Sequence, residues 1–188
     1  FRSITFGYSL ENFSPSSRST LASDGIEDRI ESVSLFIYHN DRLIFSDYKT
    51  GDFNGMKAEL ENSWKYDIYA LINMGDMRGA MPSDKSSEPL SDLTWNIPSY
   101  RHIDEEGLPM AGRLEGFEAG KDNPTITLKR LFAKVCIDIS FEYEGAKVRE
   151  VRIQNLNGTL KPFGTSCAST SSSIMTDIES DKGSGTYV

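Results

Sequence analysis

Two long stretches of this sequence alternate apolar and polar side chains with a period of two, which is the spacing of a β-strand and not of a helix. In residues 64–74 (WKYDIYALINM), every second side chain from Trp64 to Met74 is apolar, and a helix would mix the two sets. In residues 131–143 (LFAKVCIDISFEY), alternate positions from Ala133 to Tyr143 are expected to face a core. Both stretches therefore predict strands that bury at least one face.

Shorter segments elsewhere in the chain show the same alternation between turn residues. They are rich in the aromatic and β-branched residues that fit a pleated surface. The segments are residues 2–10, with Ile4, Phe6 and Tyr8 on one face; 30–38, with Val33, Leu35 and Ile37 on one face; 42–45, joined to the preceding strand by a turn at 39–41; 125–128; and 147–156, the expected antiparallel partner of 131–143.

The remaining segments lie between these strands in the sequence. Residues 57–62 are either a single helical turn or an edge segment. Residues 80–98 form a long Pro/Ser/Asp-rich connection, residues 107–112 a tight segment, and residues 113–121 a glycine-punctuated stretch. About seven strands with almost no helical period predict an all-β fold, an antiparallel β-sandwich.

A chain of 188 residues suits one domain. We expect residues 1–162 to form the sandwich, with residues 11–25 as a flexible Ser-rich linker that tethers the first strand loosely. Residues 163–188 are expected to be a loop-rich tail or the start of a truncated second domain.

Charge and cysteine content exclude several classes of protein. The net charge is -8, which argues against a surface for nucleic acid or for anionic lipid head groups. The sequence has no apolar stretch of membrane-helix length and opens at Phe1 without a leader, so we expect a cytoplasmic protein or a mature or trimmed exported one. Two cysteines cannot build a disulfide scaffold, and whether Cys136 and Cys167 pair stays open.

The residue types that carry catalysis are few and scattered. His39 and His102 are the two histidines, and neither adjoins a Ser or Cys nucleophile in the sequence, so both are expected to be loop histidines. The acidic run at residues 104–106 lacks the alternating spacing of a calcium loop. Nucleotide-binding, metalloprotease and hydrolase motifs are absent from the sequence. We therefore predict no enzymatic activity, no cofactor and no metal site.

Three aromatic side chains on the second face of the predicted strands leave two interpretations open. Phe36, Tyr38 and Tyr69 could form a platform for a sugar or a protein partner. Side chains of this kind more often pack beneath a second sheet or a long loop, and we expect that arrangement.

Several segments in a fixed order resemble the N-terminal domain of the fimbrillin-like proteins of Bacteroidales. The likeness covers roughly residues 18–156 and rests on a P-M-small-G segment that precedes an L-x-R-L-x-A-K-V strand. The matching segments here are residues 27–38 (EDRIESVSLFIY), 66–74 (YDIYALINM) followed by Gly75, 108–112 (LPMAG) and 126–139 (ITLKRLFAKVCIDI).

The resemblance implies a transthyretin-like β-sandwich that is exported through the outer membrane as a lipoprotein and placed in a cell-surface fimbrium. The sequence has no lipid-anchoring cysteine near Phe1, which we attribute to trimming. In the major pilins of this family, an Arg-specific protease removes the first strand, and a strand from another subunit replaces it. Arg18 is then the candidate processing site, and Ile4, Phe6 and Tyr8 mark the candidate exchangeable strand.

The expected partners are other fimbrial subunits, bound by β-strand addition, together with host or bacterial surface ligands. Nucleic acid is not an expected partner, and a membrane is one only through a removed, lipid-anchored N-terminus. The predicted function is that of a structural fimbrial subunit acting in assembly and adhesion. The alternative is a surface carbohydrate-binding β-sandwich lipoprotein.

Overall fold

The computed structural model describes residues 1–11, 29–51, 56–98, 102–120, 122–132, 137–140, 158–164 and 185–187. The predictions for Arg18, Cys136, Cys167 and the segment 147–156 lie outside these residues, as does nearly all of the linker predicted at 11–25. Within the described part of the chain, the fold is almost entirely β, as predicted.

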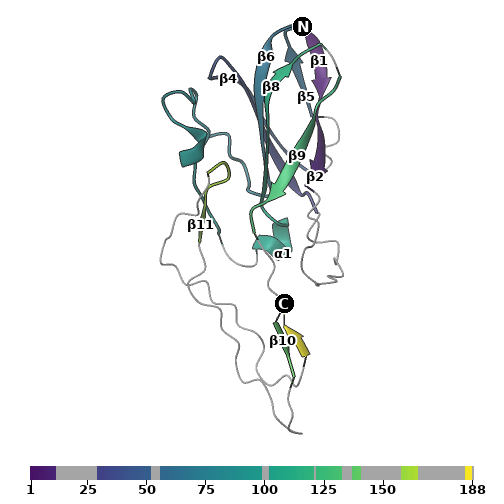
Figure 1. Ribbon diagram of the computed structural model, residues 1–188, viewed down its shortest axis with the longest axis vertical. Coiled ribbons are helices and arrows are strands. Elements are labelled where there is room, and N and C mark those ends of the chain that lie inside the picture. Colours follow the sequence, from purple (N-terminus) through teal and green to yellow (C-terminus); the bar gives the residue numbers. More distant parts are fainter. Residues whose placement is uncertain are drawn as a thin grey trace.

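A six-stranded sheet forms the centre of the fold (Figure 1). All its neighbouring strands pair antiparallel except the first two, which run parallel; the sheet is therefore mixed, whereas the sequence predicted a purely antiparallel one. In spatial order the strands are β2 (Gly7–Leu10), β9 (Thr125–Arg130), β8 (Met110–Glu118), β6 (Lys65–Ile72), β3 (Ser32–His39) and β4 (Arg42–Thr50).

Three two-stranded sheets and two short helices complete the described elements. Figure 1 shows β1 and β5 on the right of the central sheet, β11 on the left, and β10 far below. The antiparallel pairs are β1 (Arg2–Thr5) with β5 (Lys57–Leu60), β7 (Trp95–Asn96) with β11 (Thr159–Leu160), and β10 (Ile137–Ile139) with β12 (Gly185–Tyr187); the helices are α1 (His102–Glu106) and the 3-10 helix η2 (Leu90–Asp92).

Both faces of the central strands are buried, each against a different layer. In β3 and β6 the alternation predicted from the sequence is confirmed, because successive side chains enter two separate apolar clusters. The first cluster lies between the sheet and the β1–β5 pair; it includes Val33, Leu35, Ile37, Tyr66, Ile68, Ala70 and Ile72. The second lies on the opposite face; it includes Phe36, Tyr38, Tyr69, Leu71, Met77, Leu90, Trp95 and Leu160.

The prediction for residues 64–74 is wrong at both ends. Trp64 is 43% exposed and stacks on the His39 ring, with centroids 4.3 Å apart. Met74 enters the second cluster and not the first, because the chain leaves the strand at Asn73, where φ is 57°. Positive φ breaks the alternation of faces.

Residues 113–121, which the sequence shows only as a glycine-punctuated stretch, are mostly strand, because β8 runs on to Glu118. Gly116 has φ 67°, and its N–H donates a 2.7 Å hydrogen bond to Asp67 Oδ1 where the β6–β8 register shifts. Gly112 also lies within β8, where an added Cβ would lie 2.7 Å from both Ile126 Cγ2 and Thr127 O. This glycine allows β8 and β9 to approach each other closely.

The segment at 57–62, left open from the sequence, contains an edge strand, β5. The strand predicted from Leu131 is wrong at its start, because Leu131 and Phe132 lie outside any strand and pack against the second cluster. Only Ile137–Ile139 of that segment is described as strand, and its described partner is β12.

Candidate assembly interface

The first eleven residues bridge two sheets. The segment predicted as one strand is divided at Phe6 into β1 and β2. Strand β1 pairs antiparallel with β5, with Ile4 opposite Ala58, and the Phe6 N–H extends this pairing by donating to Met56 O at 3.1 Å. The same short segment therefore pairs first with β5 and then joins the six-stranded sheet beside β9.

Strand β2 forms the edge of the six-stranded sheet and runs parallel to β9. The Gly7 N–H donates to Pro124 O at 3.0 Å, and the Glu11 N–H donates to Leu128 O at 2.9 Å. Between these two bonds, Tyr8 lies opposite Ile126. If residues 2–10 were absent, β5 and β9 would each present an unpaired edge, which is the setting for strand addition.

The side chains predicted to share one face do so. Ile4 is fully buried, Phe6 is 2% exposed, and Tyr8 and Leu10 pack against the same first cluster. They cover a groove whose floor and walls are apolar; the buried side chains of this groove include Met56, Ala58, Leu60, Ile126 and Leu128. The groove and the N-terminal segment are therefore parts of a single core.

Tyr8 adds a polar contact to this apolar groove. Its hydroxyl donates to Met56 Sδ at 3.4 Å, which joins the segment to a side chain of the groove. Burial and, to a smaller extent, the negative charge of Asp47 raise the pKa of Tyr8 well above its usual value. The neutral phenol is thus the form that the fold requires.

The outer polar contacts of the segment join it to loops far away in the sequence. Arg2 Nη1 donates to Gly120 O at 3.0 Å, and the Thr5 N–H donates to Asn123 Oδ1 at 3.2 Å. Sequence reasoning identified the buried face of the segment but not Met56, Gly120 or Asn123. Their roles depend on long-range pairing, and no local pattern signals it.

Strand β4 forms the opposite edge of the six-stranded sheet, and some of its N–H groups have partners outside the strand pairing. There, Asp47 Oδ1 accepts the N–H of Tyr48 at 2.9 Å, and the Leu43 N–H donates to Ser83 O at 2.9 Å. The Gly51 N–H bonds to Glu31 O and therefore points towards β3. Because successive N–H groups of a strand point in opposite directions, the Tyr48 N–H, three residues earlier, faces away from β3. Two donors of this edge therefore already have partners.

The two histidines lie in different places, and each bonds a backbone carbonyl. His39 Nδ1 lies 2.9 Å from Lys65 O, and His102 Nε2 lies 2.7 Å from Asn73 O. The acidic run at 104–106 belongs to α1, where Glu105 O accepts a hydrogen bond from Arg29 Nη2 at 2.8 Å. Among the described residues, no group of three or more His, Cys, Asp or Glu side chains could hold a metal ion.

The aromatic platform considered for sugar binding is buried, as expected. Phe36 is fully buried and the Tyr38 hydroxyl donates to Pro82 O at 2.7 Å. Tyr69 contacts Phe163 edge-on, with ring centroids 5.1 Å apart. The connection that follows β6, together with residues 158–164, covers all three rings.

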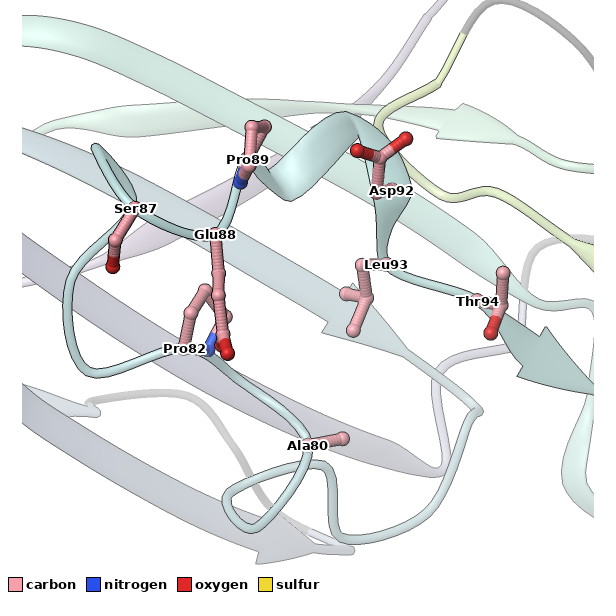
Figure 2. Close-up of a pocket in the computed structure, with 8 residues that line it drawn as sticks. All are labelled: Ala80, Pro82, Ser87, Glu88, Pro89, Asp92, Leu93 and Thr94. Atoms are coloured by element: carbon pink, nitrogen blue, oxygen red, sulfur yellow. The ribbon is translucent and has the colours of Figure 1, made fainter.

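A shallow hollow of about 570 Å³ opens on that covering connection (Figure 2). Its lining comes from one stretch of chain, with Glu88 and Pro82 on one side and Leu93 on the other. The eight lining residues are Ala80, Pro82, Ser87, Glu88, Pro89, Asp92, Leu93 and Thr94. None has an aromatic ring on which a sugar could stack.

Solved structures share this fold. The chain resembles a fimbrial assembly protein from Parabacteroides distasonis ATCC 8503 with a TM-score of 0.53 and 12% identity, over 94% of this chain and 72% of that one. It resembles a fimbrilin from Porphyromonas gingivalis W83 with a TM-score of 0.51 and 15% identity, over 89% and 52% respectively.

A third similar structure is described as a proposed polysaccharide-binding protein from Bacteroides thetaiotaomicron VPI-5482. Its TM-score is 0.56 at 16% identity, over 92% of this chain and 63% of that one. The chain thus spans between about half and three quarters of the length of these three proteins. No protein-family model matches the sequence, and no curated protein matches it. The fold of this chain is therefore the β-sandwich that these three proteins share.

No helix in the described part of the chain has the length and apolar character needed to cross a membrane.

Proposed function

We propose that this chain is a non-enzymatic structural subunit of a cell-surface fimbrium, which joins its neighbours by strand exchange and acts in adhesion. The observation that carries the proposal is the N-terminal segment, which pairs with β5 and β9 and fills an apolar groove between them. Similar structures from a fimbrial assembly protein and a fimbrilin support it.

The groove has the chemistry that strand exchange requires. Burying a side chain such as Ile4 or Phe6 stabilises a fold by about 1.5–3 kcal/mol, and the backbone of the segment bonds to both neighbouring strands. An incoming strand with the same alternation would recover both contributions. A groove left empty would expose apolar side chains and two unpaired edges, so an empty subunit would bind a donor readily.

The proposed processing site is Arg18, the only arginine in residues 12–28. Cleavage there would leave β1 and β2 attached by non-covalent contacts alone, and another subunit's strand could then displace them. Export as a lipoprotein and anchoring at the outer membrane through a removed N-terminus complete the proposal. Its partners are other pilus subunits and a surface ligand for adhesion.

Limited digestion with an Arg-specific protease tests this proposal, read by mass spectrometry and size-exclusion chromatography with partner subunits present. We expect a cut after Arg18 and then higher-order assembly. Arg18→Lys is the matched control, since it keeps the charge but removes the cleavage site. A cut followed by loss of residues 1–18, with the remainder stable and unassociated, would rule the proposal out.

The alternative, a carbohydrate-binding lipoprotein, loses support because Phe36, Tyr38 and Tyr69 are buried. Its remaining support is the third similar structure. A saccharide-specific rise in melting temperature would favour it over a fimbrial role.

A further inference from the structure

We propose that the uncut chain also associates with copies of itself, by placing residues 1–11 of one molecule in the groove of another. This proposal concerns the same groove as the proposed function. It requires neither cleavage at Arg18 nor a separate donor segment. The partner is thus a second copy of this chain.

The contacts described for the N-terminal segment are compatible with a donor from another molecule. Its side-chain hydrogen bonds to Met56, Gly120 and Asn123 span 48 to 118 positions in the sequence. The pairings with β5 and β9 are equally distant. Nothing in these contacts depends on the strand and the groove belonging to one chain.

The segment is also joined to the rest of the domain by a long connection. Seventeen residues, 12–28, separate Glu11 from Arg29, and five of them are serine. A chain of that length reaches at most roughly 60 Å when extended, which is enough to reach the groove of a neighbouring molecule.

The energetic cost of the exchange is small. The described contacts between the segment and the groove are repeated in the exchanged state, so the two states differ mainly in the entropy of association. The effective concentration of a strand tethered to its own domain is of the order of millimolar. Exchange between copies should therefore grow as the protein approaches that concentration, or when copies refold together.

The pairing also fixes the direction of the exchange. The segment runs antiparallel to β5 and parallel to β9, so a strand from a second copy can enter only in that same direction. Two copies that exchange reciprocally form a closed two-fold dimer. A copy that donates to a third molecule instead extends an open chain.

Two single-cysteine variants test this directly: Ser9→Cys and Thr127→Cys, both with Cys136→Ser and Cys167→Ser. Ser9 and Thr127 are exposed Cα partners in the β2–β9 pair, a relation within the reach of a disulfide. Since each variant carries one cysteine, a 9–127 disulfide can form only between molecules. The two are mixed, unfolded, refolded together at high concentration and mildly oxidised.

We expect a covalent heterodimer on non-reducing gels, with the 9–127 linkage identified by peptide mass spectrometry. A molecule carrying both cysteines should form the same linkage within a monomer at low concentration. Ser9→Cys mixed with Thr50→Cys is the control for random collision, because Thr50 is exposed at the far edge of the sheet. The pair Ser3→Cys and Glu59→Cys repeats the test at the β1–β5 edge.

Heterodimers from both matched pairs and not from the control would support exchange between intact copies. Their absence, when the double-cysteine molecules cross-link internally, would overturn it, and so would equal yields from the control pair. Failure here would leave assembly after cleavage untouched, because that experiment uses cut subunits with separate partners.

Discussion

Gly107 lies directly against Asn73: a Cβ added to the glycine would be 2.5 Å from Asn73 Nδ2 and 2.9 Å from Arg29 O. Asn73 is fully buried, and its side-chain amide bonds four backbone groups, accepting from the N–H groups of Glu31 and Ser32 and donating to the carbonyls of Arg29 and Leu108. The Asn73 amide, just after β6, therefore links two other segments by hydrogen bonds: the chain that enters β3 and the chain that precedes β8.

We predict that Gly107→Ala strongly destabilises the domain. Gly107 has φ +86°, so alanine there would be strained and would also displace the Asn73 amide from its partners. We expect a loss of about 3 kcal/mol or more in the free energy of unfolding by urea. Gly116→Ala is the matched control, with φ +67° and nothing within 4 Å of the added Cβ. Strain alone should cost about 1–2 kcal/mol there. Equal losses in the two variants would contradict the contact with Asn73.

A second prediction concerns Lys85, whose Nζ lies 3.4 Å from Asp41 Oδ1 and also bonds Asp67. Burial acts to raise the pKa of Asp67, but the hydrogen bonds from Lys85 and the Gly116 N–H outweigh it and hold the pKa below its usual value. Asp67 therefore contributes stability above the ordinary aspartate pKa, and this is lost as the pH falls through its lowered value. Lys85→Met should cost about 1–2 kcal/mol at pH 7 and flatten the acid side of the stability curve.

Lys85 and Tyr38 determine how the stability of the domain changes at alkaline pH. Burial works to lower the pKa of Lys85, but the bond to Asp67 raises it overall, and burial raises the pKa of Tyr38 to about 12. Both groups keep their protons in the fold after the unfolded chain has lost them, so stability should fall as the pH rises above about 10. The free energy of unfolding by urea, measured from pH 2 to 11, tests both the acid and the alkaline prediction. Arg78→Met, which breaks an exposed pair with Asp76, is the control and should leave the midpoint at pH 7 unchanged.

Asp47→Ala is predicted to increase self-association through β4. The change frees the Tyr48 N–H on the outer edge of the six-stranded sheet, and unpaired edge donors are templates for another strand. Light scattering at increasing concentration measures the effect. Asp47→Asn keeps an oxygen acceptor at the same place and should behave like the parent chain. If the asparagine variant associates as readily as the alanine variant, charge and not the hydrogen bond protects this edge.

Phe6→Ala should loosen the N-terminal segment without unfolding the central sheet. The side chain is 2% exposed, and replacing a buried phenylalanine costs about 3–5 kcal/mol. Because the segment is at an edge, we expect the cost to appear as local opening, with amides of β5 and β9 exchanging hydrogen about 100-fold faster or more. Ser9→Ala, at an exposed position, is the control. Equally faster exchange in β3 and β6 would mean that the segment opens only with the whole domain.

The sequence predicted the central strands well and the connections poorly, for physical reasons. Residues 33–37 and 66–72 carry their own alternation, and burial on both faces preserves it. The sequence places Gly112 in a tight segment and Gly116 in a glycine-punctuated stretch, but one allows close strand packing and the other lies at an irregularity inside β8. A local pattern cannot distinguish these uses of glycine.

The candidate interface was predicted in part. Ile4, Phe6 and Tyr8 were placed on one buried face, and they lie there. The division at Phe6 was not predicted, because it depends on the positions of β5 and β9, which are far away in the sequence. The exchange of this strand and the processing at Arg18 stay predictions.

The division of the N-terminal segment between two sheets has a mechanical consequence. Its backbone bonds lie across the strand axis, on one side to β5 and then on the other to β9. Tension along such a strand would load all these hydrogen bonds together in shear. A sideways pull would instead unzip the strand and break the bonds one at a time. A filament whose subunits are linked by this strand should therefore resist pulling along its length better than peeling from the side. Single-molecule stretching from the two directions would measure that anisotropy.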